Sequence, residues 1–129
     1  MPVRPSGFIG AAWFLAAALG ATGAQGAGDP GQAVFARCAV CHALEPGVNR
    51  LGPSLDGIVG RKAGALAGFR YSPAMKASGL TWTPENLDRF IAAPHAVIPG
   101  TNMAFADVSQ PEDRADLLAY LVKSAGGRR

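Results

Sequence analysis

The stretch that decides the fold is Cys38-Ala39-Val40-Cys41-His42, a C-x-x-C-H run. Two cysteines at this spacing, followed at once by a histidine, are typical of covalent haem attachment. The two thiols add across the two vinyl groups of the porphyrin, and the adjacent imidazole is placed to bind the iron. The sequence holds no other cysteine, which excludes a disulfide framework and a four-cysteine metal site. The run therefore predicts one covalent haem, anchored by Cys38 and Cys41, with His42 as an axial ligand of the iron.

Two other kinds of site use similar residues. A thioredoxin-like redox pair would need a βαβ context, and the Gly- and Pro-rich flanks of this motif do not provide one. A zinc site made of Cys38, Cys41, His42 and His95 has an acceptable number of ligands. Because Cys41 and His42 are adjacent, they can hardly both reach one tetrahedral ion. Haem attachment is therefore the better interpretation.

The first 26 residues have the organisation of a secretory signal peptide. Arg4 is the single charge near the start, and residues 8–19 form an uncharged apolar stretch followed by small residues in 20–27. The apolar stretch is shorter than the ~20 residues that span a bilayer, so we expect cleavage rather than a retained anchor. This predicts a mature domain of residues 27–129 in the periplasm, with no stable membrane insertion.

The predicted mature chain is small and nearly neutral. Without Arg4 it holds 11 Lys and Arg against nine Asp and Glu, and two haem propionates would bring the charge close to zero. Nucleic-acid binding usually needs a concentrated basic patch, so no nucleic-acid partner is expected. A chain this small buries only ~60–70% of its unfolded surface, and a covalently held porphyrin would supply much of the missing core.

Helical signals begin shortly after the predicted signal peptide. Asp29-Pro30 predicts the start of a first helix, with Asp29 as its cap. Apolar residues and the haem-attachment motif then share one stripe at three- and four-residue spacing, made of Gly31, Val34, Phe35, Cys38, Cys41 and His42.

Three further pairs, Ser72-Pro73, Thr83-Pro84 and Gln110-Pro111, predict the starts of later helices. The last helix carries acidic residues in its first turn, and Lys123 lies near its end, before Gly126-Gly127. No segment predicts a strand. The predicted fold class is all-α.

The remaining stretches, residues 44–70 and 93–109, are rich in Gly and Pro and show no alternating apolar pattern. They are predicted to be long loops. A packed haem would hold them in place, because few of their residues can form a core of their own.

A low-spin electron carrier needs a second axial ligand, and the residue types offer His95, Met75 and Met103. Met103 ends the run Pro99-Gly100-Thr101-Asn102-Met103, which has no helix or strand signal. Such a loop can present a thioether to the iron from the side opposite His42. A methionine in a loop is more often a packing residue, so residue chemistry alone leaves all three open.

The mature chain resembles a class I cytochrome c over almost its whole length, of the soluble bacterial type similar to mitochondrial cytochrome c. The matching pieces occur in the family's order and spacing: Cys38-Ala39-Val40-Cys41-His42, Gly52-Pro53-Ser54-Leu55, Gly60-Arg61-Lys62-Ala63-Gly64, Tyr71-Ser72-Pro73-Ala74-Met75, Thr81-Trp82, Ile98-Pro99-Gly100-Thr101-Asn102-Met103 and Leu117-Leu118-Ala119-Tyr120-Leu121. The resemblance implies the small cytochrome c fold, with helices and long loops wrapped around one haem c. It also implies that His42 and Met103 bind the iron.

By the same resemblance, several residues have roles around the haem. The Pro53 carbonyl is implied to accept the proton on the far nitrogen of His42, which fixes the ring and raises its basicity. Arg61, Tyr71 and Trp82 are implied to bind the propionates, which would otherwise be buried without partners.

The chain also departs from its relatives. Members that dock on mitochondrial-type oxidases carry a ring of lysines around the haem edge, whereas the mature chain has only Lys62, Lys76 and Lys123. Strong electrostatic steering toward an acidic partner is therefore not expected. Phe90 replaces a common tyrosine near the methionine ligand, and Met75 occupies a position that is often polar.

The resemblance implies a periplasmic one-electron carrier of a respiratory chain, acting as a monomer and not as an enzyme. Its expected partners are membrane or periplasmic redox proteins, such as an oxidase, a reductase or a dehydrogenase. Two alternatives remain open: a dedicated electron-transfer subunit of a periplasmic dehydrogenase, and a haem peroxidase or sensor with a labile sixth ligand.

Overall fold

The structure, a computed structural model, describes residues 2–3, 7, 10, 28–104 and 108–126. Within these residues the elements are α1 (Pro30–Cys38), α2 (Pro73–Ala77), α3 (Pro84–Ala92), α4 (Pro94–Val97) and α5 (Pro111–Gly126). The same residues form no strand, and one isolated antiparallel bridge pairs Lys62 with Thr81. The predicted all-α fold with long loops is confirmed. The predicted signal peptide lies almost entirely outside the described residues.

The helix starts follow from local chemistry. Each of the first three helices has proline at its first position, where the missing N–H costs nothing. The residue before each proline caps the helix with its side chain: Asp29 accepts from the Gly31 N–H, Ser72 from Met75 and Thr83 from Asn86. These three predicted starts are confirmed, as is the start of α5 at Pro111.

Two sequence predictions need correction. The stripe expected to run helically through Cys41 and His42 stops at Cys38, because the Cys41 N–H turns back to the Cys38 carbonyl (3.0 Å) and the Cys41 carbonyl accepts from Gly52 (2.8 Å). The stretch 93–109 was predicted to be a loop throughout, but it contains α4. That helix has no side-chain cap, so its start carries no sequence signal beyond Pro94.

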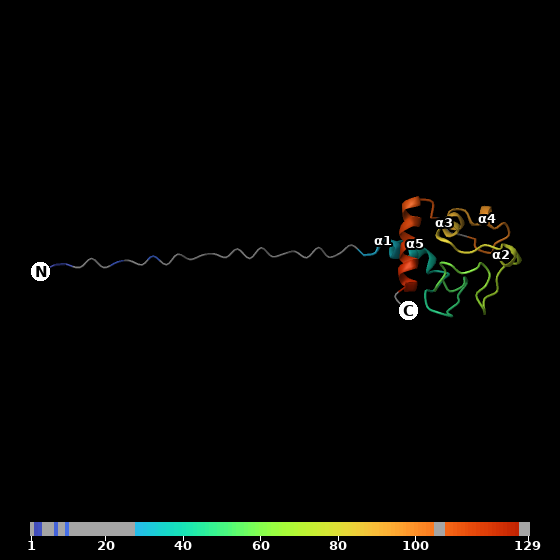
Figure 1. The fold of residues 1–129 in the computed structure, drawn as a ribbon, viewed down its shortest axis with the longest axis horizontal. Coiled ribbons are helices and arrows are strands. Elements are labelled where there is room, and N and C mark those ends of the chain that lie inside the picture. The colour runs from blue at the N-terminus through green and yellow to red at the C-terminus, as the bar shows by residue number, and fades with distance from the viewer. Residues whose placement is uncertain (1, 4–6, 8–9, 11–27, 105–107, 127–129) are drawn as a thin grey trace.

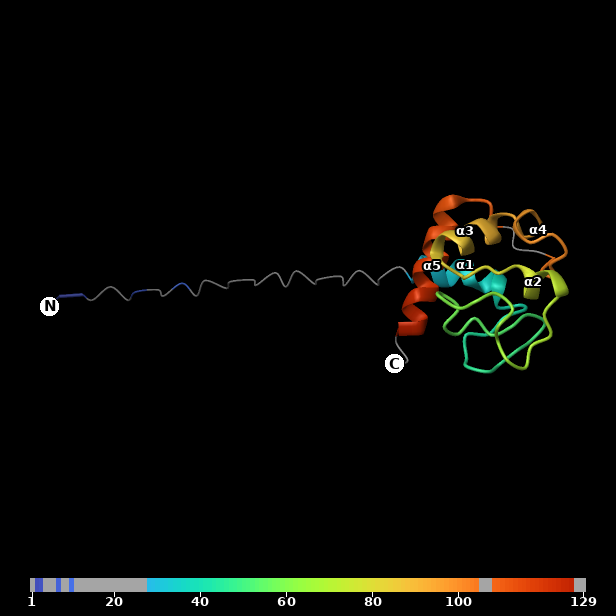
Figure 2. The ribbon, with the colours of Figure 1, turned by 45° about the vertical axis from the view of Figure 1, so that its right-hand side comes forward.

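Helices α1 and α5 cross at one end of the domain, with α3 and α4 on one side and the loops of residues 44–70 on the other (Figures 1 and 2). The crossing is close because Gly31 is buried there: a Cβ would meet the Asp116 carbonyl and lie 2.5 Å from the Tyr120 Cβ. Phe35 packs against Tyr120, with ring centroids 5.7 Å apart. The close approach of the two helices therefore requires a glycine at position 31.

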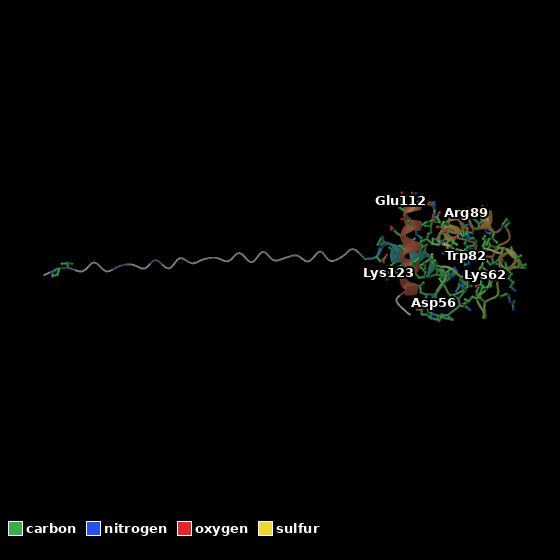
Figure 3. The ribbon with its side chains drawn as sticks, viewed as in Figure 1. Asp56, Lys62, Trp82, Arg89, Glu112 and Lys123 are labelled. Carbon is green, nitrogen blue, oxygen red and sulfur yellow. The ribbon has the colours of Figure 1, made fainter. Side chains whose placement is uncertain are left out.

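Helix α5 carries Glu112 in its first turn and Lys123 in its last, toward opposite ends of the helix (Figure 3). Both charges are favourable with respect to the helix dipole. The buried apolar core draws on α1, α2, α3, α5 and the loops, and consists of Val34, Phe35, Ile58, Met75, Trp82, Leu87, Phe90, Ile91, Ile98, Val108, Leu117 and Leu121. Many of these residues also line one cavity, so the core is arranged around a space.

Candidate haem site

A largely apolar cavity of about 200 Å³ lies inside the domain. Three of the four predicted site residues, Cys38, His42 and Met103, line it. Cys41 is not part of the lining, and it lies in the turn between Cys38 and His42 as a half-buried free thiol. The structure therefore brings the predicted anchors and ligands to one place from two distant parts of the chain.

The structure distinguishes only partly among the three candidates for the second iron ligand. His95 is exposed on α4 and does not line the cavity, whereas both Met75 and Met103 do. Met75 is 9% exposed and belongs to the apolar core. No group of three or more His, Cys, Asp or Glu side chains gathers to hold a metal ion within residues 28–104 and 108–126. One histidine and two methionine thioethers therefore line the cavity as possible ligands of the iron.

The His42 ring is held by its neighbours in one orientation. Its Nδ1 lies 2.6 Å from the Pro53 carbonyl oxygen, which can only accept, so Nδ1 carries the proton. Burial holds the pKa of His42 below its usual range; the Pro53 bond opposes this shift and the Arg61 cation adds to it. The ring is therefore neutral at neutral pH and keeps its Nε2 lone pair for a metal.

Gly52 has a role that the sequence did not reveal. A Cβ there would run into the His42 ring, 2.7 Å from its Nδ1 and Nε2 atoms. The Gly52 N–H also donates to the Cys41 carbonyl, which ties this loop to the haem-attachment motif. The sequence signal for this role is the position of Gly52 directly before Pro53. A backbone segment whose carbonyl accepts a hydrogen bond from the imidazole must also pass close to the imidazole ring.

The backbone of the motif positions its thiols. The N–H groups of Cys41 and His42 both donate to the Cys38 carbonyl, over 3.0 and 2.8 Å. Burial raises the pKa of the Cys38 thiol, with the Arg37 cation opposing the shift. Cys38 is therefore a neutral thiol at the cavity wall, unlike the low-pKa thiolate of a redox enzyme.

Arg61 presents an unused donor at this cavity. Its Nη2 donates to the Ser54 carbonyl (2.9 Å) and its Nη1 to the Asp56 carbonyl (3.2 Å), whereas its Nε is buried with no partner in the described structure. Burial lowers the Arg61 pKa, and Tyr71 and Asp56 oppose this shift. A buried N–H without an acceptor is unfavourable. A bound group with a hydrogen-bond acceptor would therefore be stabilised beside the Arg61 Nε.

The wall fits a haem. Among the described residues it includes Arg61 and Arg70 but no Asp or Glu, and the rest is mainly apolar and aromatic. Tyr71 and Trp82, to which the resemblance also assigned the propionates, both line it. An apolar space with cationic donors and no competing carboxylate matches a flat apolar macrocycle that bears two carboxylates.

Comparisons with known proteins identify the family of this chain. The model of the family Cytochrome c matches residues 28–125. Cytochrome c2 of Rhodomicrobium vannielii is 45% identical over 114 residues, which cover 86% of this chain and 91% of that protein. Cytochrome c2 of Agrobacterium tumefaciens is 47% identical over 102 residues, covering 76% and 92%. The solved structure of cytochrome cH from Methylobacterium extorquens superposes with a TM-score of 0.69 at 42% identity, covering 73% of this chain and 95% of that one.

The fold and the cavity thus define a haem protein of the all-α class. The chain belongs to the cytochrome c family: it is an electron-transport protein with one covalently bound c-type haem and its iron. The predicted family, fold and cofactor are confirmed. None of the helices in the described residues is long and apolar enough to span a membrane.

Proposed function

We propose that this protein is a periplasmic one-electron carrier whose haem is attached through Cys38 and Cys41 and ligated by His42 and Met103. One observation supports this most directly: His42 and Met103 line the same cavity, although 60 intervening residues separate them in the chain. When bound, the haem supplies a single iron that gains or loses one electron. Two protein ligands would leave that iron no open position, which argues for a carrier rather than an enzyme.

The residues around the two ligands suit this task. The Pro53 carbonyl orients the His42 ring and raises its basicity by accepting its proton. A thioether ligand favours the reduced state and raises the potential, as is usual for His/Met cytochromes. Met75 and Phe90 are buried in the cavity wall and bring no hydroxyl or charge. These residues keep the site apolar, which further disfavours the more highly charged oxidised state.

The surface near the motif suits transient contact with another redox protein. Val40 and Leu51 are 74% and 84% exposed, and Leu51 also lines the cavity. They lie in neighbouring segments, because Gly52 donates to the Cys41 carbonyl and Arg50 donates to the Ala39 carbonyl. This exposed apolar pair, of which Leu51 lines the cavity, suits a docking face for a small, short-lived encounter.

The signal-like residues 1–26 support a periplasmic location, and partners of the expected kind are an oxidase, a reductase or a dehydrogenase. Monomeric action fits the small transient contact proposed above. A dedicated subunit of a dehydrogenase would use the same site, and would differ by purifying together with that enzyme.

The ligand assignment is tested by Met103→Ala, with Met75→Ala as the matched control from the same cavity. In both variants the haem should stay attached, because attachment depends on Cys38 and Cys41. Only Met103→Ala should lose the red absorption band that arises from methionine-to-ferric-iron charge transfer, and its potential should fall substantially. A retained band in Met103→Ala, or its loss in Met75→Ala, would show that Met103 is not the ligand.

A further inference from the structure

The charged residues of the cavity wall are two arginines, Arg61 and Arg70, with no Asp or Glu among the described lining residues. A c-type haem carries two propionate carboxylates. Arg61 donates from Nη1 and Nη2 to the carbonyls of Asp56 and Ser54, and its buried Nε has no partner in the described structure. Tyr71 and Trp82 are neutral donors, so the single positive charge of Arg61 can balance only one of the two propionates and leaves the other negative charge without a cation.

We propose that Arg70 pairs with the haem propionates as a second cation, at the exposed side of the wall. The inference rests on the c-type haem of the family and not on which residue is the second axial ligand. In this role Arg70 sets part of the electrostatic environment of the haem in the proposed carrier.

The structure places Arg70 well for this role. Its neighbours Phe69 and Tyr71 also line the cavity and contact each other edge-on, with ring centroids 4.9 Å apart. The two rings hold the backbone of this segment against the wall. Arg70 itself is exposed and has no hydrogen bond or ion pair to any other described residue. Its guanidinium is therefore available to a carboxylate at the opening, and its planar fork suits that partner.

The local charge pattern supplies a matched comparison. Residues 61–80 contain Arg61, Lys62, Arg70 and Lys76 and no acidic residue. Lys62 is exposed in the same segment but does not line the cavity. Removing the charge of Lys62 changes the net charge of the protein as much as removing that of Arg70. A difference between the two variants therefore reports position rather than total charge.

The experiment measures the midpoint potential of the purified holoprotein for Arg70→Gln, Arg70→Lys and Lys62→Gln. A cation that neutralises a propionate disfavours the oxidised iron, so Arg70→Gln should favour oxidation at least threefold in the redox equilibrium constant. At 59 mV per tenfold change for one electron, this lowers the potential by about 28 mV. Lys62→Gln should shift it much less, and Arg70→Lys should recover most of the shift.

Two further readouts separate this role from simpler ones. Denaturant unfolding should be the same for Arg70→Gln and Lys62→Gln, which shows that the shift in potential does not come from damage to the fold. Equal potential shifts in these two variants, or no recovery in Arg70→Lys, would overturn the proposal. A wild-type protein without the red methionine band would contradict the Met103 assignment alone, because the propionates are present whatever the sixth ligand is.

Discussion

Arg114 on α5 donates from Nε to the Asp88 carboxylate on α3 over 2.7 Å, and from Nη1 to the carbonyls of Val108 and Ser109 over 3.0 and 2.9 Å. The Arg114 side chain is only 11% exposed. One cation thus joins two helices to residues 108 and 109, which lie just before α5. Because Asp88 and Arg114 are 26 residues apart, this link belongs to the tertiary structure alone.

We expect Arg114→Ala to lower the free energy of unfolding by about 2–3 kcal/mol, since it removes charge-assisted hydrogen bonds and leaves the buried Val108 carbonyl without its donor. Lys123→Ala is the control. It breaks an ion pair with Asp29 in which the lysine side chain is 77% exposed, and it should cost far less. Guanidinium unfolding of the two variants measures the difference. Equal losses would show that Arg114 acts as an ordinary surface charge.

The cap of α1 should make stability depend on pH in the acid range. The hydrogen bond from Lys123 holds the pKa of Asp29 below its usual range, opposed by desolvation and supported by the Gly31 N–H. A carboxylate with a lowered folded pKa contributes stability above its unfolded pKa of ~3.9, and loses it as pH falls through the folded pKa. Acid unfolding of Lys123→Ala should therefore depend less on pH below about 5 than that of wild type. Lys76→Ala, on α2, should behave like wild type, and indistinguishable curves for all three proteins would contradict this cause.

Gly52→Ala should damage the histidine side of the site. The new Cβ has no room beside the His42 ring, so either the ring or the loop must move, at a cost of about 1–3 kcal/mol. The haem should remain attached, and the absorption spectrum should change together with the unfolding midpoint. Gly28→Ala has open space and should leave both unchanged. A wild-type spectrum and midpoint in Gly52→Ala would mean that the ring is not held in place by this glycine.

Electron transfer to an acceptor should depend only weakly on salt. Without the predicted signal peptide and with two haem propionates, the protein would be nearly neutral, and the exposed face near the motif contains the apolar residues Val40 and Leu51. Steered association falls steeply with ionic strength only where surface charge is strongly of one sign. The second-order rate constant with a purified mitochondrial-type oxidase should change a few-fold from low salt to above physiological salt. A decrease of about a hundredfold or more would reveal steering by a local basic patch, such as the cations of residues 61–80.

The signal peptide remains a prediction, and the intact mass of the secreted protein tests it. Expression in a bacterium that matures c-type cytochromes should yield a periplasmic chain beginning near residue 27, with the added mass of one haem. Val122→Ser, a change on the distant helix α5, serves as a mass and secretion control. A full-length chain in the membrane fraction would indicate a retained anchor.

Much of this protein could be predicted from short stretches of sequence, because the chemistry involved is local. A capping side chain before a proline starts a helix whatever surrounds it, which is why Asp29-Pro30, Ser72-Pro73 and Thr83-Pro84 marked three helices correctly. The C-x-x-C-H run likewise specifies its cofactor within five residues. Helix α4 was not predicted, because Ala93, the residue before its first proline, has no side chain that could cap the helix.

By itself, then, the sequence determined the cofactor and most helix starts, which depend on residues a few positions apart, and the family, which follows from the order of several short motifs along the chain. Only the tertiary structure decided where distant segments meet: Met103 and Met75 in one cavity with His42, Gly52 against the histidine ring, and Arg61 and Arg70 in the wall of that same cavity. These contacts depend on the path of the long loops, which no local pattern of residues specifies. That path follows from packing around a shared apolar space, so it emerges only when the whole chain is folded.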